Sequence, residues 1–208
     1  MKKTILITMF LIGTVWSTFA QSSPSNPRQL NEAISSADIT LTARGNGSSS
    51  GAAIDGTLKN NTSRPIYINV NLDDGIYLLN SGSGQNMIAT NILLANGRYS
   101  MLGGKNRFIS LQPNSNTGII MIAFCANYER ENPLNTETFT SAYMPADLAN
   151  ISAKIAKYIA DNFDSDEDFT IPAQLALWAA QGLNQKQIRK QFYFNSSDWE
   201  ISASIQNY

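Results

Sequence analysis

The chain has 208 residues, with 15 Lys and Arg, 16 Asp and Glu, a single Cys and no His. The lack of His excludes Ser-His-Asp and Cys-His nucleophile pairs and any His-ligated metal, and one Cys excludes an internal disulfide and a metal cage of cysteines. A formal net charge of −1 argues against nucleic-acid binding, which needs a basic surface.

Residues 1–20 have the pattern of a secretory signal peptide. Two lysines precede an almost wholly apolar run over 4–15, and residues 18–20 give the small-aromatic-small pattern of a cleavage site. The run is shorter than the roughly 20 residues of a spanning helix, so we expect cleavage rather than anchoring. The mature chain is then expected to be secreted, periplasmic or on the cell surface, with no membrane span.

Short strands are expected next in the chain. Residues 21–37 form a polar leader, expected to be mobile and able to hold a short helix around Leu30 and Ile34. From 38 to 126, β-type runs alternate with turns rich in Asn, Gly and Ser. The runs predict strands at 39–43, 53–59, 66–72, 75–79, 87–94, 107–111 and 118–125. Strands at this spacing predict an antiparallel, Ig-like β-sandwich.

Residues 127–208 predict a small helical appendage, so the expected class is α+β. Residues 127–143 indicate a connection with one extended stretch. Apolar spacings of three and four indicate a helix that begins at Pro145. Further helices are predicted over 172–181, ended by Gly182, and over 185–192. Alternating apolar and polar residues over 199–208 predict a C-terminal strand that returns to the edge of the sandwich.

Two residues are the candidates for chemistry. Cys125 follows the apolar run 119–124. Gln174 lies in a predicted helix that is apolar on every side, so its carboxamide needs partners, because an unpaired buried polar group costs about 1–3 kcal/mol. We expect both groups to lie in apolar surroundings, where one fold can bring them together.

The two segments resemble the paired motif of bacterial surface thioester domains. Phe124 and Cys125 match an aromatic-Cys segment, and Gln174 to Trp178 match a Gln-x-Ala-aliphatic-Trp helix. The resemblance implies that the Cys125 thiol and the Gln174 carboxamide condense, with loss of ammonia, into an internal thioester that acylates a partner's amine. Phe124 and Trp178 are then expected to shield the bond. Burial and proximity favour such a condensation.

The resemblance covers residues 119–181 and departs from the family at Asn127 and Ala173. The alternative is that Cys125 is a small buried hydrophobe and that Gln174 hydrogen-bonds to a loop. The sequence therefore predicts a secreted or envelope binding module of adhesion type, not an enzyme and without a cofactor. Its partner is an unknown protein or cell-surface ligand, bound either through the thioester or non-covalently.

Other candidate sites have weaker support. The acidic residues 164–168 begin like a calcium loop, but Phe169 stands where an EF-hand needs Gly and Leu175 where it needs Glu. We therefore expect a solvated loop and no metal site. A carboxylate-based enzyme would need two acids that converge in a cleft, and no motif indicates such a pair.

Overall fold

The structure is a computed structural model that describes residues 22–101, 107–163 and 168–208. The predicted signal peptide and the acidic residues 164–167 lie outside the described residues. Within the described ranges, no helix has both the length and the apolar character needed to cross a membrane.

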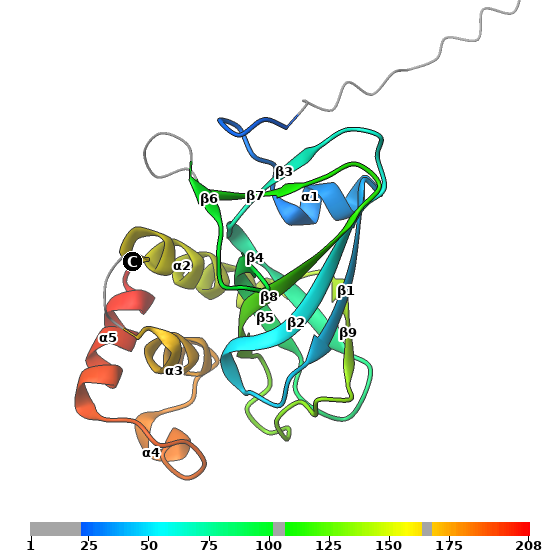
Figure 1. Ribbon diagram of the computed structural model, residues 1–208. Helices are drawn as coiled ribbons and strands as arrows, with labels where there is room; N and C mark the ends of the chain where they lie inside the picture. Colours follow the sequence, from blue (N-terminus) through cyan, green and yellow to red (C-terminus); the bar gives the residue numbers. More distant parts are fainter. Residues whose placement is uncertain (1–21, 102–106, 164–167) are drawn as a thin grey trace, which may run out of the picture.

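Six antiparallel strands form a closed barrel, in the order β1-β2-β8-β5-β4-β9 (Figure 1). They are β1 (Ile39–Gly45), β2 (Ser50–Asn60), β4 (Asn71–Asn80), β5 (Met87–Leu94), β8 (Asn116–Cys125) and β9 (Thr138–Ala142). A separate sheet has the order β3-β7-β6, from β3 (Ile66–Asn69), β7 (Arg107–Leu111) and β6 (Ser100–Met101). Aliphatic side chains such as Leu58, Leu78 and Ile92 fill the barrel interior.

The prediction of an Ig-like β-sandwich is wrong, although the α+β class stands. The correction comes from β9, which lies in the segment predicted to be a connection. Phe139 of β9 is paired with Ala43 of β1, and Ala142 is paired with Tyr77 of β4. A sandwich has two open sheets, whereas β9 joins the last two edges and closes the barrel. Period-two alternation shows that a strand has a buried face, but it does not tell whether the sheet closes on itself.

Most strand predictions agree with the structure, and 87–94 and 107–111 coincide with β5 and β7. The predicted strand 66–72 is divided at Val70 into β3 and β4. The Val70 N–H donates to the Arg107 carbonyl at 3.1 Å, and its carbonyl accepts from the Ile92 N–H at 2.9 Å. Val70 therefore links the small sheet to the barrel.

Among the described residues, five helices accompany the strands: α1 (Leu30–Ser35), α2 (Ala146–Asn162), α3 (Thr170–Ala180), α4 (Gln185–Ile188) and α5 (Ser196–Gln206). Figure 1 shows α2, α3 and α5 gathered on one side of the barrel. Their apolar faces form one buried cluster with Ile88 and Phe124 from β5 and β8. The helical part therefore packs on the barrel through a continuous apolar layer.

The predicted C-terminal strand is wrong, because this segment forms the helix α5. The Asn195 side chain accepts from the Asp198 N–H at 2.9 Å, and the Asp198 carboxylate accepts from the Asn195 N–H at 2.8 Å. This reciprocal capping box begins the helix. Ser202 and Ile205, three positions apart, are its buried residues, so the buried spacing is helical although the sequence alternates.

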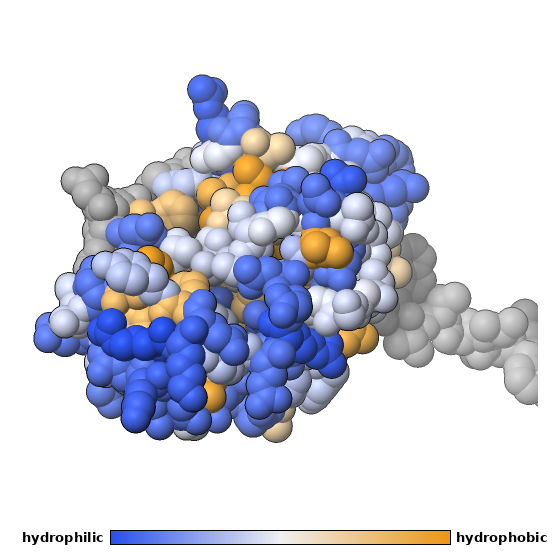
Figure 2. All heavy atoms as spheres, turned by 90° about the horizontal axis from the view of Figure 1, so that it is seen from below, coloured by the Kyte–Doolittle hydropathy of each residue, from blue (hydrophilic) through white to orange (hydrophobic). Residues whose placement is uncertain are grey.

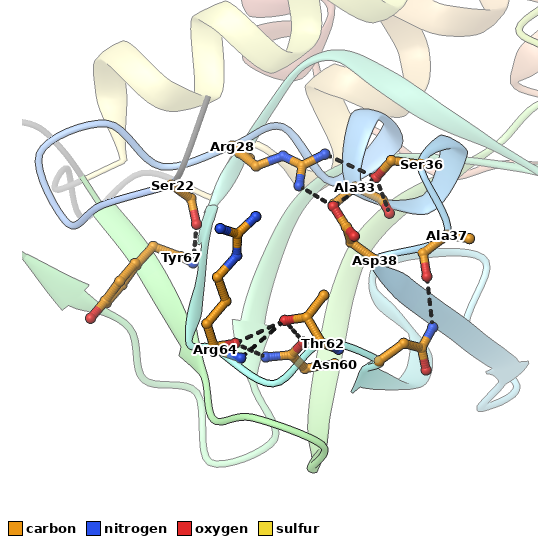
Figure 3. A network of polar contacts seen from close by, with 11 residues as sticks. Ser22, Arg28, Ala33, Ser36, Ala37, Asp38, Asn60, Thr62, Arg64 and Tyr67 are labelled. Carbon is orange, nitrogen blue, oxygen red and sulfur yellow. Dashed lines mark hydrogen bonds and ion pairs between the residues drawn. The ribbon is translucent and has the colours of Figure 1, made fainter. Parts of the chain in front are cut away.

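Polar contacts hold the segment before β1 against the small sheet and α1 (Figure 3). The Arg28 N–H donates to the Tyr67 carbonyl at 2.9 Å, in the segment predicted to be a leader. The Arg28 guanidinium forms an ion pair with Asp38 at 2.6 Å and donates to the Ser36 hydroxyl at 3.0 Å. With Leu30 fully buried, these contacts fix α1 beside the start of β1.

Candidate functional site

The fold brings Cys125 and Gln174 together. Cys125 is the last residue of β8 and Gln174 lies in α3, and neither is exposed to solvent. The Cys125 N–H donates to the Gln174 Oε1 at 2.7 Å, and the Gln174 Nε2 donates to the Cys125 carbonyl oxygen at 2.9 Å. The carboxamide is thus held against the backbone of the residue that carries the thiol.

The position at which β2 begins explains why a carboxamide is needed beside the backbone of Cys125. Ser50, the first residue of β2, is paired with Phe124, so the β2–β8 ladder ends one residue before Cys125. A buried backbone N–H and C=O need partners, and a primary amide offers one acceptor and two donors. Gln174 therefore takes the place of the next residue of β2 along the edge of β8.

The start of α3 is placed by a close contact with β2. Gly51 has a φ of +75°, and a Cβ there would lie 3.0 Å from the Thr170 Cγ2. A glycine is thus required both by the backbone conformation and by the approach of the helix. From 172 to 178 every residue of α3 is buried, which fixes the depth at which Gln174 lies.

The Cys125 thiol lies in an apolar environment. Its sulfur donates to the Met87 Sδ at 3.6 Å, and Met87 is the residue opposite Cys125 on β5. Burial raises the pKa of the Cys125 thiol to about 12, so the thiol is protonated at neutral pH. Only the Cα and Cβ atoms separate this sulfur from the N–H that binds the Gln174 carbonyl, so the thiol and that carbonyl lie in the same small region.

The two predicted shielding residues lie in different apolar clusters. Phe124 is fully buried in the layer between the barrel and the helices. Trp178 is 4 % exposed and belongs to the larger apolar cluster, which includes Cys125 and the aliphatic residues of the barrel. Its ring makes edge-to-face contacts with Tyr128 and Phe192, at centroid distances of 5.1 and 5.2 Å. Apolar groups therefore surround the Cys125–Gln174 pair on both faces of β8.

Sequence reasoning missed the residues that hold the chain just after Cys125. The Asn86 carbonyl accepts from the Ala126 N–H at 2.8 Å, and the Asn127 side-chain oxygen accepts from the Asn86 N–H at 3.0 Å. The Gln85 side chain in turn accepts from the Asn127 N–H at 3.2 Å. Asn and Gln are common in turns throughout this chain, so no sequence signal distinguishes these residues.

Glu137 is a buried acidic residue near this end of the barrel. Its carboxylate accepts from the Asn80 Nδ2 at 2.8 Å, the Leu134 N–H at 2.9 Å and the Gly84 N–H at 3.1 Å. These donors, the Asn80 amide first, hold the pKa of the Glu137 carboxyl below its usual value. The carboxylate thereby fixes the loop 80–86 that contacts the Cys125 segment.

A hollow of about 330 Å³ lies beside Trp178. Ser49, Gln85, Tyr128 and Phe192 line it together with the charged residues 129–131. Figure 2 looks onto the end of the molecule that carries α4, where hydrophilic residues cover most of the surface and hydrophobic residues show in small separate areas. The hollow thus has a mostly polar lining and borders Trp178, which lies one helical turn after Gln174 in α3.

In the part of the chain that the structure describes, no group of three or more Cys, Asp or Glu side chains could hold a metal ion. Comparison of the chain with protein-family models, with curated proteins and with solved structures finds no match. The function of the Cys125–Gln174 site therefore has to be inferred from its own geometry.

Proposed function

We propose that this chain is an exported binding module of adhesion type, in which Cys125 and Gln174 condense into an internal thioester that acylates an amine of a protein or cell-surface partner. The observation that carries the proposal is the direct hydrogen bonding of the Gln174 carboxamide to Cys125 in a fully buried setting. Export rests on the signal-peptide pattern of residues 1–20.

Condensation requires the sulfur to attack the Gln174 amide carbon. A new S–C bond forms, the C–Nε2 bond breaks, and the thiol proton leaves with the amide nitrogen as ammonia. The Cys125 N–H, 2.7 Å from Oε1, lies where negative charge develops on the oxygen during the attack. Fixed proximity offsets the low thiolate fraction that a pKa of about 12 implies.

Acyl transfer would use the bond so formed. A partner's amine attacks the Gln174 carbonyl carbon, an amide bond forms, and the released sulfur takes the proton from the amine. Trp178 lines the same hollow as Gln85 and lies one helical turn after Gln174 in α3, so we expect it to keep water out until a partner docks. The polar and charged lining of that hollow supports a partner with a polar surface.

A second candidate is a non-covalent envelope binding protein in which the pair is structural. Two observations favour it. Both polar atoms of the Gln174 carboxamide are already paired with the Cys125 backbone, which completes the end of the β8 edge. The thiol is protonated and donates a hydrogen bond to the Met87 sulfur. In this case the partner binds elsewhere on the surface, and neither residue reacts.

Methylamine labelling of the folded mature chain distinguishes the two functions. A thioester predicts that methylamine becomes attached to the side chain at position 174, found by peptide mapping, while one thiol becomes titratable at position 125. Absence of the adduct together with a thiol that is present before treatment would refute the thioester and leave the non-covalent function.

Three variants control this experiment. Cys125→Ala and Gln174→Leu each remove one reacting group, so both should show no adduct. Gln181→Leu makes the same substitution at the exposed residue that follows the last residue of α3, and it should label like the wild type. An adduct at position 174 in the Cys125→Ala chain would show that labelling does not depend on a thioester.

A further inference from the structure

A second hollow, of about 390 Å³, lies where the small sheet, the barrel and the end of α2 meet. Its lining includes Asn71 of β4, Asn91 of β5, Arg107 of β7 and Asp161 of α2. None of these residues belongs to the Cys125–Gln174 site. The Arg107 guanidinium donates to the Ala160 carbonyl at 3.4 Å, which ties the small sheet to α2 across the hollow.

Asn91 is the unusual residue of this hollow. It is 1 % exposed, yet neither its Nδ2 nor its Oδ1 has a hydrogen-bond partner among the described residues. The Asn71 Oδ1, opposite it in the strand pairing, is buried and unpaired as well. Buried polar groups without partners destabilise a fold, so their presence side by side on a hollow indicates that they serve a ligand.

A distortion of β5 places Asn91 at this position. The register shifts between Ala89 and Asn91 against both neighbouring strands, β4 and β8. Such a bulge redirects the side chains next to it and is common beside binding sites. The backbone is therefore adapted at the point where the unpaired carboxamide lines the hollow.

The charges of the lining limit the class of ligand. Arg107 is the basic residue among those that line the hollow, and the Asp73 and Asp161 carboxylates share the lining. Asp161 also accepts from Lys157 at 2.7 Å, and Asp73 accepts from Gln29 at 2.6 Å. The lining therefore has no excess of positive charge that would attract an anion.

Arg107 also stiffens an aromatic edge of the hollow. Its guanidinium carbon lies 4.5 Å from the centroid of the Phe163 ring, which lines the hollow, and 5.7 Å from that of Tyr99. A ring held in this way offers a fixed apolar surface. The hollow thus combines carboxamides, carboxylates and an aromatic ring.

We propose that this hollow binds a neutral sugar residue. A sugar hydroxyl both donates and accepts, which matches a carboxamide with both atoms unpaired and a neighbouring unpaired amide oxygen. Carboxylates accept from further hydroxyls, and the Phe163 ring suits the apolar face of a pyranose. The volume falls in the range of small-molecule sites. The inference does not depend on the thioester.

The test uses the mature chain with neutral glucose, galactose and N-acetylglucosamine, and with glucuronic acid and glucosamine as charged comparators. Saturation-transfer NMR detects contact, and calorimetry measures affinity. We expect at least one neutral sugar to bind more tightly than either charged one. No binding of a neutral sugar below about 10 mM, or tighter binding of glucuronic acid, would overturn the proposal.

Asn91→Leu replaces the unpaired carboxamide of Asn91 by an apolar side chain of similar volume. We expect this variant to bind the sugar at least about tenfold more weakly and to unfold roughly 2–4 °C higher, because it no longer buries unpaired polar atoms. Asn150→Leu, at an exposed position on α2, is the matched control and should bind like the wild type. Unchanged sugar affinity in Asn91→Leu would overturn the assignment.

If Asn91→Leu does not fold, Asp73→Asn decides the question, because Asp73 is exposed and its replacement should leave the fold intact. The proposal expects this variant to bind the neutral sugar about threefold or more weakly, since one acceptor of its hydroxyls is weakened. Equal affinity of Asp73→Asn and the wild type would contradict it.

Discussion

Replacing Gln174 by Leu tests how the barrel edge is completed. Leucine has a similar volume, so the substitution removes the carboxamide without opening a large cavity. In the wild type the N–H and the carbonyl of Cys125 are hydrogen-bonded to Gln174 at 2.7 and 2.9 Å, and the substitution leaves both of them unpaired. Each stranded buried group costs about 1–3 kcal/mol, and apolar burial of the leucine offsets part of this, so we expect a net loss of about 2–4 kcal/mol.

The measurement is urea unfolding in a Cys125→Ala background, where no thioester can form and the backbone of residue 125 is retained. The free energy of unfolding is compared with and without Gln174→Leu at a constant m value. Gln181→Leu in the same background is the control, and a change within about 0.5 kcal/mol is expected there. A loss below about 0.5 kcal/mol for Gln174→Leu would refute the proposed role of the carboxamide as a substitute for the missing β2 residue.

Three further predictions concern the same fold. If the pair is not covalently bonded, Cys125→Ala alone should lower the free energy of unfolding by about 1–2 kcal/mol, because it leaves a small cavity beside Met87, and a loss above about 4 kcal/mol would contradict simple truncation. The pKa of Glu137 is lowered, so its contribution to stability is present above its ordinary pKa of 4.5 and is lost as the pH falls through the folded value. Acid unfolding should therefore be less pH-dependent in Glu137→Gln than in the wild type, and equal pH slopes below about pH 4.5 would contradict the shift. Asn195→Ala should cost about 0.5–2 kcal/mol in thermal unfolding through loss of the α5 cap, whereas an unchanged midpoint would show that the capping box is dispensable.

The sequence predicts local structure well where the pattern is strong. The strand 87–94 and the spaced apolar residues of α2 are predicted correctly, because a mostly apolar run and apolar spacings of three and four are direct signals in the sequence. The closure of the barrel leaves no such trace. It depends on β9, a short strand in which Phe139 is the one buried residue, and on pairing between segments far apart in the chain.

The site could be predicted in part, because the sequence indicates which groups are buried. An amide in an apolar helix and a thiol at the end of an apolar strand indicate two buried groups, and the fold places them in contact. That the carboxamide pairs with the backbone of Cys125 depends on β2 beginning at Ser50, which the sequence does not determine. Asn91 could not be found at all, because its position on the second hollow follows from a bulge in β5.

The intact mass of the mature chain, measured by mass spectrometry under native conditions and without added amines, decides whether the bond forms. Condensation of Cys125 with Gln174 predicts a mass about 17 Da below that calculated from the sequence, the loss of one ammonia. A full calculated mass, with one thiol that titrates after unfolding, would contradict the thioester and leave Gln174 as a purely structural partner of Cys125.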